Sequence, residues 1–168
     1  MNLIPELWAS FKSTVRGFDS PRQLALGLAF GVLIGLLPKD SLLPYAIGII
    51  AVLTPGNLVC LAAGTILGSL TSPLLDGLTH EIGLAALTYT PLESTWTSIY
   101  QLPLAPWTRL NNTVLMGNLL LGLALMAPIY LVSNQFFLRL GPPLYRWLSG
   151  TSLAKRLVNS PTPQLQES

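Results

Sequence analysis

Two long stretches of the chain carry no charged residue, and apolar side chains dominate both of them. Residues 41–75 and 110–138 contain no Lys, Arg, Asp or Glu. A helix in water needs a solvated face, so helices that are apolar all round are typical of a membrane interior. The pattern predicts an all-α, polytopic integral membrane protein.

The apolar runs differ in length, and length decides how each run can sit in a bilayer. Residues 58–75 and 113–138 are predicted to be transmembrane helices, because about 20 apolar residues cross the hydrocarbon core. Residues 22–37 and 42–53 would form helices only about 18 to 25 Å long. They predict a glycine-rich helical hairpin that either re-enters the membrane or makes two short crossings. Segment length alone favours the re-entrant form.

The segments around these runs are amphipathic or polar. Residues 3–18 place apolar side chains at steps of three and four, which predicts an amphipathic helix at the membrane interface. Residues 76–112 are rich in Tyr and Trp and predict an outer-side segment of short surface helices and irregular chain. Residues 139–159 are expected to form a basic tail helix that completes a single membrane domain, and residues 160–168 a disordered tail.

Basic residues gather toward the two ends of the chain. Lys12, Arg16 and Arg22 precede the first apolar run, and four more follow the last one, namely Arg139, Arg146, Lys155 and Arg156. Because Lys and Arg favour the cytoplasmic side, both termini are expected in the cytoplasm of a bacterial inner membrane. Segment 76–112 has a single basic residue, Arg109, which suits the outer side. A net charge of +2 is too small for a nucleic-acid-binding protein.

Glycines recur at intervals of four in two of the apolar runs. This spacing places them on one face of each helix, and such a face lets another helix approach closely, within or between chains. We therefore expect five helix-packing residues, namely Gly27, Gly31, Gly35, Gly64 and Gly68. Asn57 and Asn118 are polar residues within or beside the runs. We expect them to hydrogen-bond with neighbouring helices.

The junction between the two short runs is a candidate polar site. It consists of Pro38, Lys39, Asp40 and Ser41. In a re-entrant hairpin these residues would lie deep in the membrane, where charges are costly and usually functional. With two short crossings they would form an ordinary solvated turn. The sequence leaves both possibilities open.

The residues that could support chemistry are few. Asp76, His80 and Glu81 are the candidates for an acid and base pair, and one His with the distant Cys60 does not make a zinc site. We therefore expect neither a metal nor a cofactor. The leading hypothesis is a small non-enzymatic component of the lipid bilayer that assembles through its glycine faces, as a homo-oligomer or with a membrane-protein partner. One alternative is a lipid or small-solute transporter that uses the hairpin tip, and another is an envelope-lipid or glycan enzyme subunit.

Several of these features occur together in a known pattern. The pattern comprises Ser20-Pro21, then Ala25-x-Gly27-x-Ala29-x-Gly31-x-x-x-Gly35-x-x-Pro38, then Asn57 and Gly64-Thr65. Over about residues 20–75 the chain resembles the uncharacterised bacterial membrane family catalogued as domain of unknown function twenty sixty-two. It departs from that family at Ser41 and Leu43, where Gly and Gln are expected. The resemblance implies a bacterial inner-membrane protein, sometimes a domain beside glycosyltransferases, with no established reaction.

Overall fold

The computed structural model describes residues 20–101, 103 and 105–150. Within these residues every regular element is a helix, which confirms the all-α expectation. The predicted interfacial helix at residues 3–18 and the predicted tail at 160–168 lie outside the described residues, as does the end of the predicted tail helix after residue 150.

Four helices form the body of the molecule. Two of them are short, α2 (Pro21–Leu36) and α3 (Leu43–Leu53), and two are long, α4 (Leu58–Leu87) and α7 (Thr113–Gly150). Between α4 and α7 the chain forms three small elements, which are the 3₁₀ helix η1 (Thr90–Leu92), α5 (Glu93–Tyr100) and α6 (Ala105–Thr108).

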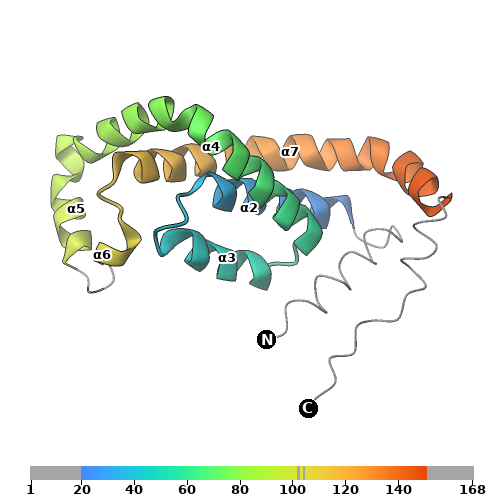
Figure 1. Cartoon of the computed structure of the whole chain (residues 1–168), viewed down its shortest axis with the longest axis horizontal. Coiled ribbons are helices and arrows are strands. Elements are labelled where there is room, and N and C mark those ends of the chain that lie inside the picture. Colours follow the sequence, from blue (N-terminus) through green and yellow to red (C-terminus); the bar gives the residue numbers. More distant parts are fainter. Residues whose placement is uncertain (1–19, 102, 104, 151–168) are drawn as a thin grey trace, which may run out of the picture.

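Helix α2 lies in the middle of the body (Figure 1). It packs against both α4 and α7, which also pack against each other, while α3 lies on its other side and contacts chiefly α2. The linker 37–42 lies at the same end of the molecule as α5 and α6. The linker 54–57 lies at the other end, beside the start of α2, where the Asn57 amide donates to the Gln23 carbonyl at 2.9 Å.

The start of α2 follows from its sequence. The Gln23 amide donates to the Ser20 hydroxyl at 3.3 Å, and the Ser20 amide donates to the Gln23 side-chain oxygen at 2.9 Å. This reciprocal pair is a capping box, and Pro21 occupies the first helical position, where its missing N–H is not needed. Ser20 and Pro21 therefore fix the start of α2.

Helices α4 and α7 continue beyond the predicted spans. Helix α4 contains Pro73 and runs on to Leu87, so the exit predicted at Asp76 does not coincide with a helix end. The extension is stabilised by packing, because Thr79 and Gly83 are buried against the start of α7. Helix α7 likewise continues without a break past residue 138 to Gly150. The short surface helices expected within 76–112 are α5 and α6.

The buried core of the described residues is small and centres on α2. It comprises mainly Leu and Ala side chains of α2 together with Leu115 and Met116 of α7. Among the described residues, two helical segments are long and apolar enough to cross a membrane, Leu58–Leu87 and Thr113–Arg139. Only 11% and 28% of their most apolar stretches are buried, so these helices are not the enclosed core of a water-soluble fold.

Candidate functional site

The glycines of α2 lie directly against α4. A Cβ atom added to Gly31 would lie 2.9 Å from the Cα of Gly64, and one added to Gly35 would lie 2.7 Å from the Cα of Gly68. At Gly27 an added Cβ would collide with the Asn57 carbonyl oxygen. The five predicted packing glycines therefore form a single contact surface between two helices of the same chain, which we call the glycine seam. No larger side chain fits there without moving a backbone.

A second close contact joins α4 to α7. A Cβ added to Gly83 would collide with the Thr113 carbonyl oxygen, and one added to Gly117 would collide with the Thr79 carbonyl oxygen. This contact does not follow from the spacing of glycines alone, because each helix contributes only one glycine to it. Thr79 with Gly83, and Thr113 with Gly117, are pairs of small residues four positions apart. This wider small-residue spacing is the signal that could have identified the contact.

Lys39 of the hairpin tip covers the carboxyl end of α2. Its ammonium donates to the carbonyl oxygens of Ile34 at 2.7 Å, Gly35 at 3.0 Å and Leu37 at 2.7 Å. A helix end has carbonyls without partners and a partial negative charge, so a cation stabilises it. Partial burial lowers the pKa of Lys39, while the surrounding carbonyl oxygens favour its charged form.

Two hydroxyl groups of α4 complete the polar contacts of this helix end. Ser69 donates to the Gly35 carbonyl at 3.3 Å, and Ser72 donates to the Leu36 carbonyl at 3.0 Å. The last carbonyls of α2 therefore have partners from both its own linker and α4. The carboxyl end of α2 is fixed in position by these bonds.

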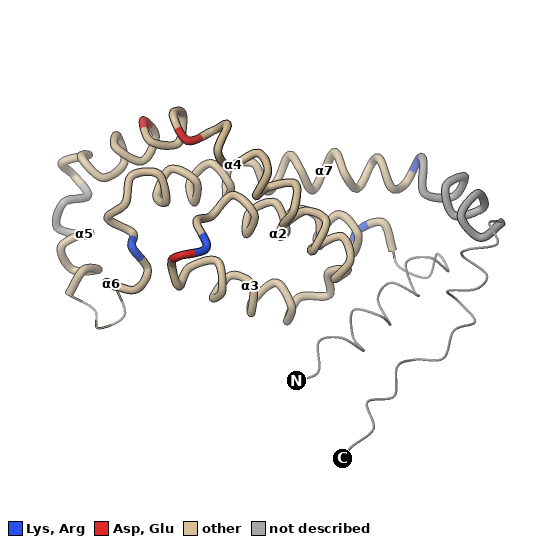
Figure 2. Tube along the Cα trace, viewed as in Figure 1, with Lys and Arg blue, Asp and Glu red and all other residues tan. Residues whose placement is uncertain are grey.

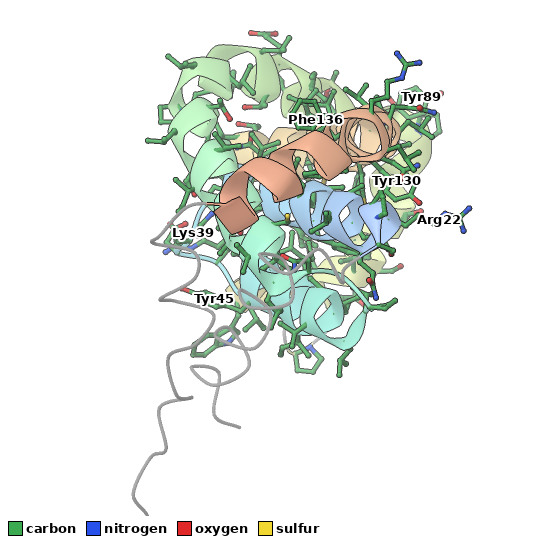
Figure 3. The ribbon with its side chains drawn as sticks, turned by 90° about the vertical axis from the view of Figure 1, so that its right-hand side faces the viewer. Arg22, Lys39, Tyr45, Tyr89, Tyr130 and Phe136 are labelled. Atoms are coloured by element: carbon green, nitrogen blue, oxygen red, sulfur yellow. The ribbon has the colours of Figure 1, made fainter. Side chains whose placement is uncertain are left out.

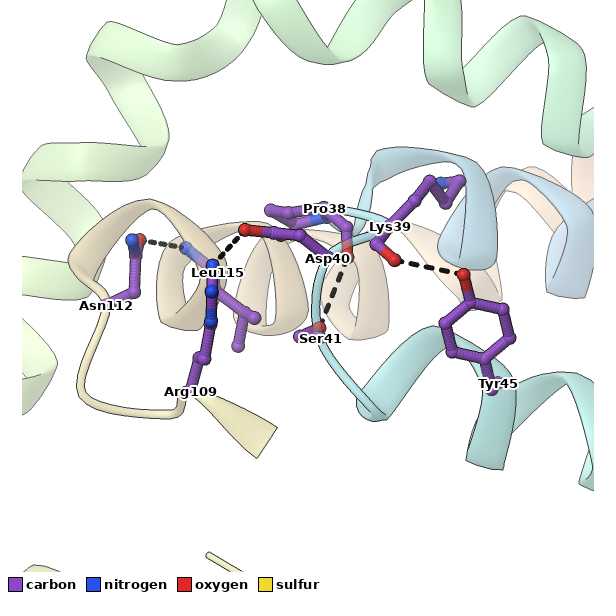
Figure 4. A network of polar contacts seen from close by, with 8 residues as sticks. All are labelled: Pro38, Lys39, Asp40, Ser41, Tyr45, Arg109, Asn112 and Leu115. Carbon is purple, nitrogen blue, oxygen red and sulfur yellow. Dashed lines mark hydrogen bonds and ion pairs between the residues drawn. The ribbon is translucent and has the colours of Figure 1, made fainter. Parts of the chain in front are cut away.

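The rest of the hairpin tip contacts the segment before α7 (Figure 4). Asp40 forms an ion pair with Arg109, and the Leu42 amide donates to the Trp107 carbonyl at 3.0 Å. Ser41 donates to the Pro38 carbonyl at 3.2 Å. The structure thus brings the predicted tip residues together with Arg109. From the sequence, Arg109 stood out only as the single basic residue of segment 76–112, and its contact with the tip was not predicted.

The tip residues differ in exposure, and their polar groups are already engaged. Ser41 is buried, while Asp40 and Arg109 are more than half exposed as side chains. The Tyr45 hydroxyl donates to the Lys39 carbonyl at 3.0 Å and holds the start of α3 against the tip. This arrangement is an anchored turn at the surface.

The three acid and base candidates lie on the extension of α4. His80 Nδ1 lies 2.7 Å from the Thr113 hydroxyl, and Asp76, His80 and Glu81 are all exposed. No group of three His, Cys, Asp or Glu side chains suited to a metal occurs in the part of the chain that the structure describes. The contact between His80 and Thr113 is therefore a structural one, which joins α4 to α7.

Asn118 is completely buried on α7, and its side-chain amide has no hydrogen-bond partner among the described residues. The expectation that it bonds to a neighbouring helix is wrong. Gly122 lies four residues further along α7 and contacts Leu33 of α2, so Asn118 shares the face of α7 that packs against α2. Asn57 instead caps its own helix, because its side-chain oxygen accepts from the Cys60 amide at 2.8 Å.

Charged residues in the described part of the chain gather at the two ends of the molecule (Figure 2). One group lies on the linker 37–42, on the segment before α7 and on the middle of α4, whereas the other lies at the start of α2 and on α7. The charged residues of the first group of segments are Lys39, Asp40, Arg109, Asp76 and Glu81, and those of the second are Arg22 and Arg139. The band between them has no described charge. Helix α2 crosses this band, because Arg22 lies in its first turn and Lys39 follows shortly after its end. Its 16 residues correspond to a band about 24 Å deep.

Large apolar side chains are exposed around this band. Leu74 of α4 is 83% exposed and Leu53 of α3 79%, and Tyr45 and Phe136 point outward from α3 and α7 (Figure 3). Large exposed apolar surfaces are typical of faces that contact lipid or another protein.

Comparisons with known proteins place the chain in a family. It is 25% identical over 132 residues to a protein of Treponema pallidum (strain Nichols) described as "Uncharacterized protein", covering 79% of this chain and 81% of the relative. No solved structure matches. The family described as "Uncharacterized protein conserved in bacteria (DUF2062)" matches residues 9–140, a longer region than the resemblance over residues 20–75. The chain belongs to this bacterial family of uncharacterised proteins.

Proposed function

We propose that this protein is a small polytopic membrane component in which α2, α3, α4 and α7 all cross the bilayer. The observation that carries the proposal is the charge-free band, because its exposed surface is apolar and charged residues flank it at both ends. Lipid tails are the environment that stabilises such a surface. Its depth of about 24 Å, estimated from α2, suits a crossing of a thin or locally thinned bilayer.

The placement of the hairpin tip supports four crossings over a re-entrant hairpin. The tip pairs with Arg109 and Trp107 at the end of the molecule that carries α5 and α6. At the other end, the linker after α3 contacts the start of α2. Helix α2 therefore runs the full depth of the band, and the shorter α3 returns across it together with its two linkers. The basic residues Arg22 and Arg139 favour the cytoplasm for the end that holds residue 20.

We favour a non-enzymatic role because the polar candidates already have structural partners. Lys39 binds the end of α2, Asp40 pairs with Arg109, and His80 contacts Thr113. A transporter would need polar groups that can exchange partners at membrane depth, and an enzyme would need a clustered acid and base. The anchored tip supports neither alternative.

Assembly with a second copy or another membrane protein would use surfaces outside the glycine seam. The seam is occupied by α2 and α4 of one chain. The outer face of α4 remains, and Gly77 of that helix has open space beside it. We propose that partner contacts form on the outer face of α4.

Cysteine labelling in intact cells tests the topology. In a variant with Cys60→Ala, single cysteines replace Asp40, Thr95 or Pro55, which are all exposed. Four crossings require that an impermeant reagent label positions 40 and 95 from outside, and position 55 only after the membrane is opened. Labelling of position 95 without position 40 would support the re-entrant hairpin instead. Recovery of the protein in the soluble fraction would overturn the membrane proposal.

Assembly is tested on the purified protein in detergent. Light scattering with size-exclusion chromatography should show a defined oligomer, or a stable stoichiometric partner should co-purify. A monomer that moves a lipid or solute across reconstituted vesicles would favour the transporter alternative.

A further inference from the structure

Helix α3 exposes a shorter apolar surface than α7, which lies on the opposite side of α2. Helix α3 has 11 residues, so its helical part is about 16 Å long. The exposed apolar residues of α7 extend from Leu120 to Leu138, a stretch without charged residues that spans about 27 Å along the helix. The height of the apolar surface therefore differs by about 10 Å between α3 and α7.

The position of α3 along the band is fixed at both ends. Its first turn is held by the hydrogen bond from the Leu42 amide to the Trp107 carbonyl and by the Asp40–Arg109 ion pair in the preceding linker. Its last turn leads into linker 54–57, which is held to α2 by the bond between the Asn57 amide and the Gln23 carbonyl. The helix cannot slide or tilt freely to meet a thicker bilayer.

The outward face of α3 has the side chains of a lipid-facing surface. Its exposed residues are Leu42, Tyr45, Ala46, Ile49, Ile50 and Leu53, with no charged, Ser, Thr or Gly residue among them. The helices of this protein approach one another closely through Gly and Thr positions, as in the glycine seam. Branched aliphatic side chains instead suit flexible acyl chains, which adapt to a rough surface.

We propose that the outward face of α3 binds phospholipid acyl chains in a locally thinned bilayer, while α7 contacts bilayer of ordinary thickness. A hydrophobic surface shorter than the hydrocarbon core is matched by thinning of the bilayer around it. Tyr45, at the tip end of α3, belongs to the residue class that sits at the headgroup level. The inference rests on the proposed membrane insertion and adds a lipid-selective side to the molecule.

The test compares the lipids beside α3 and α7 through tryptophan quenching. The four native tryptophans are replaced by Phe, and a single Trp is introduced as Ile49→Trp on α3 or Leu131→Trp on α7, both exposed positions. Leu53→Trp and Val132→Trp form a second pair in case one variant fails to fold. Each protein is reconstituted in mixtures of short-chain and long-chain phosphatidylcholine in which one of the two is brominated.

The expected result is a preference for the short-chain lipid at position 49 that exceeds the one at position 131 by about threefold. Equal preferences at both positions would overturn the inference, because the apolar belt would then be uniform. Quenching at 131 without quenching at 49 would also overturn it and would show that protein covers α3. If neither Trp is quenched, the membrane insertion itself is wrong, which separates that failure from failure of the inference.

Discussion

Helices α2 and α3 are neighbouring short apolar helices, yet one is the most enclosed helix of the body and the other the most peripheral. Much of α2 is buried, including Leu24, Ala25, Ala29 and Leu33. On α3 only Pro44 and Ala51 are buried, and Leu53 is 79% exposed. The uncharged sequence of α3 is if anything the more apolar of the two. Hydrophobicity therefore does not decide which helix occupies the centre.

The difference lies in small residues. Helix α2 carries a glycine at every fourth position and packs against α4 backbone to backbone, whereas α3 has a single glycine, Gly48, with open space beside it. If lipid surrounds the bundle, burial of apolar side chains gives little gain and close packing selects neighbours. Four predictions test this contrast, in order of expected effect.

Gly31→Leu should have the largest effect, and Gly48→Leu is its matched control. At position 31 the new side chain would displace the backbone around Gly64, and we expect a loss of more than about 3 kcal/mol or failure to fold. At position 48 nothing lies within 4 Å, so the same change should be tolerated. Thermal unfolding in detergent, followed by circular dichroism, measures both. Similar losses of stability at the two positions would show that α2 and α3 do not differ in how closely their glycines pack.

Lys39→Met tests the carboxyl end of α2. Three carbonyl oxygens would lose their ammonium donor, and because this residue is partly solvated we expect a loss of about 1 to 2 kcal/mol. Lys39→Arg should retain part of the stability, since a guanidinium can still donate to some of these oxygens. The matched change at the end of α3 is Thr54→Val. It should matter less, because two backbone bonds from the Thr54 amide remain, to Ile50 and Ala51. An unchanged unfolding temperature for Lys39→Met would show that water replaces the ammonium.

The starts of the helices, and the ends of the two short ones, could be predicted from local sequence, but the ends of α4 and α7 could not. Ser20-Pro21 marks the start of α2, and α4 and α7 begin at Leu58 and Thr113, where the apolar runs begin. The end of α4 was different. The predicted span ended at residue 75, before the charge of Asp76, whereas packing of Thr79 and Gly83 against α7 stabilises the helix to Leu87. The spacing of small residues can mark a face that packs closely, but it does not specify where the helix ends.

The same limit applies to the candidate site. Glycine spacing predicted which face of α2 would pack closely, but not that the partner would be α4 of the same chain. The pairing of Asp40 with Arg109 joins residues 69 positions apart. A single sequence gives charge and periodicity, which are properties of one segment, and neither specifies which distant residue completes a pair.

Asn118→Leu tests whether the side-chain amide of Asn118, which is buried near α2, lacks a hydrogen-bond partner. Leucine has a similar volume and removes a buried amide that has no partner, so we expect a gain of about 1 to 2 kcal/mol. Asn57→Leu is the control at a second buried asparagine. It should instead lose about 1 kcal/mol, because Asn57 caps α4. Opposite shifts in unfolding temperature would support the assignment, and a loss at position 118 would mean that its amide has a partner such as an internal water.

The smallest expected effect concerns the contact that holds the tip of α3. Arg109 has φ of 52°, in the left-handed region, directly after α6. Arg109→Gly and Arg109→Ala both remove the exposed ion pair with Asp40, which contributes about 0 to 1 kcal/mol. Glycine adopts this backbone conformation without strain, while alanine does not, so the Gly variant should be more stable by about 1 kcal/mol. Chemical denaturation of the two variants measures the difference. Equal stability would show that the backbone at position 109 relaxes once the ion pair with Asp40 is lost. The contact that holds the start of α3 would then depend more on this ion pair than on the turn at position 109.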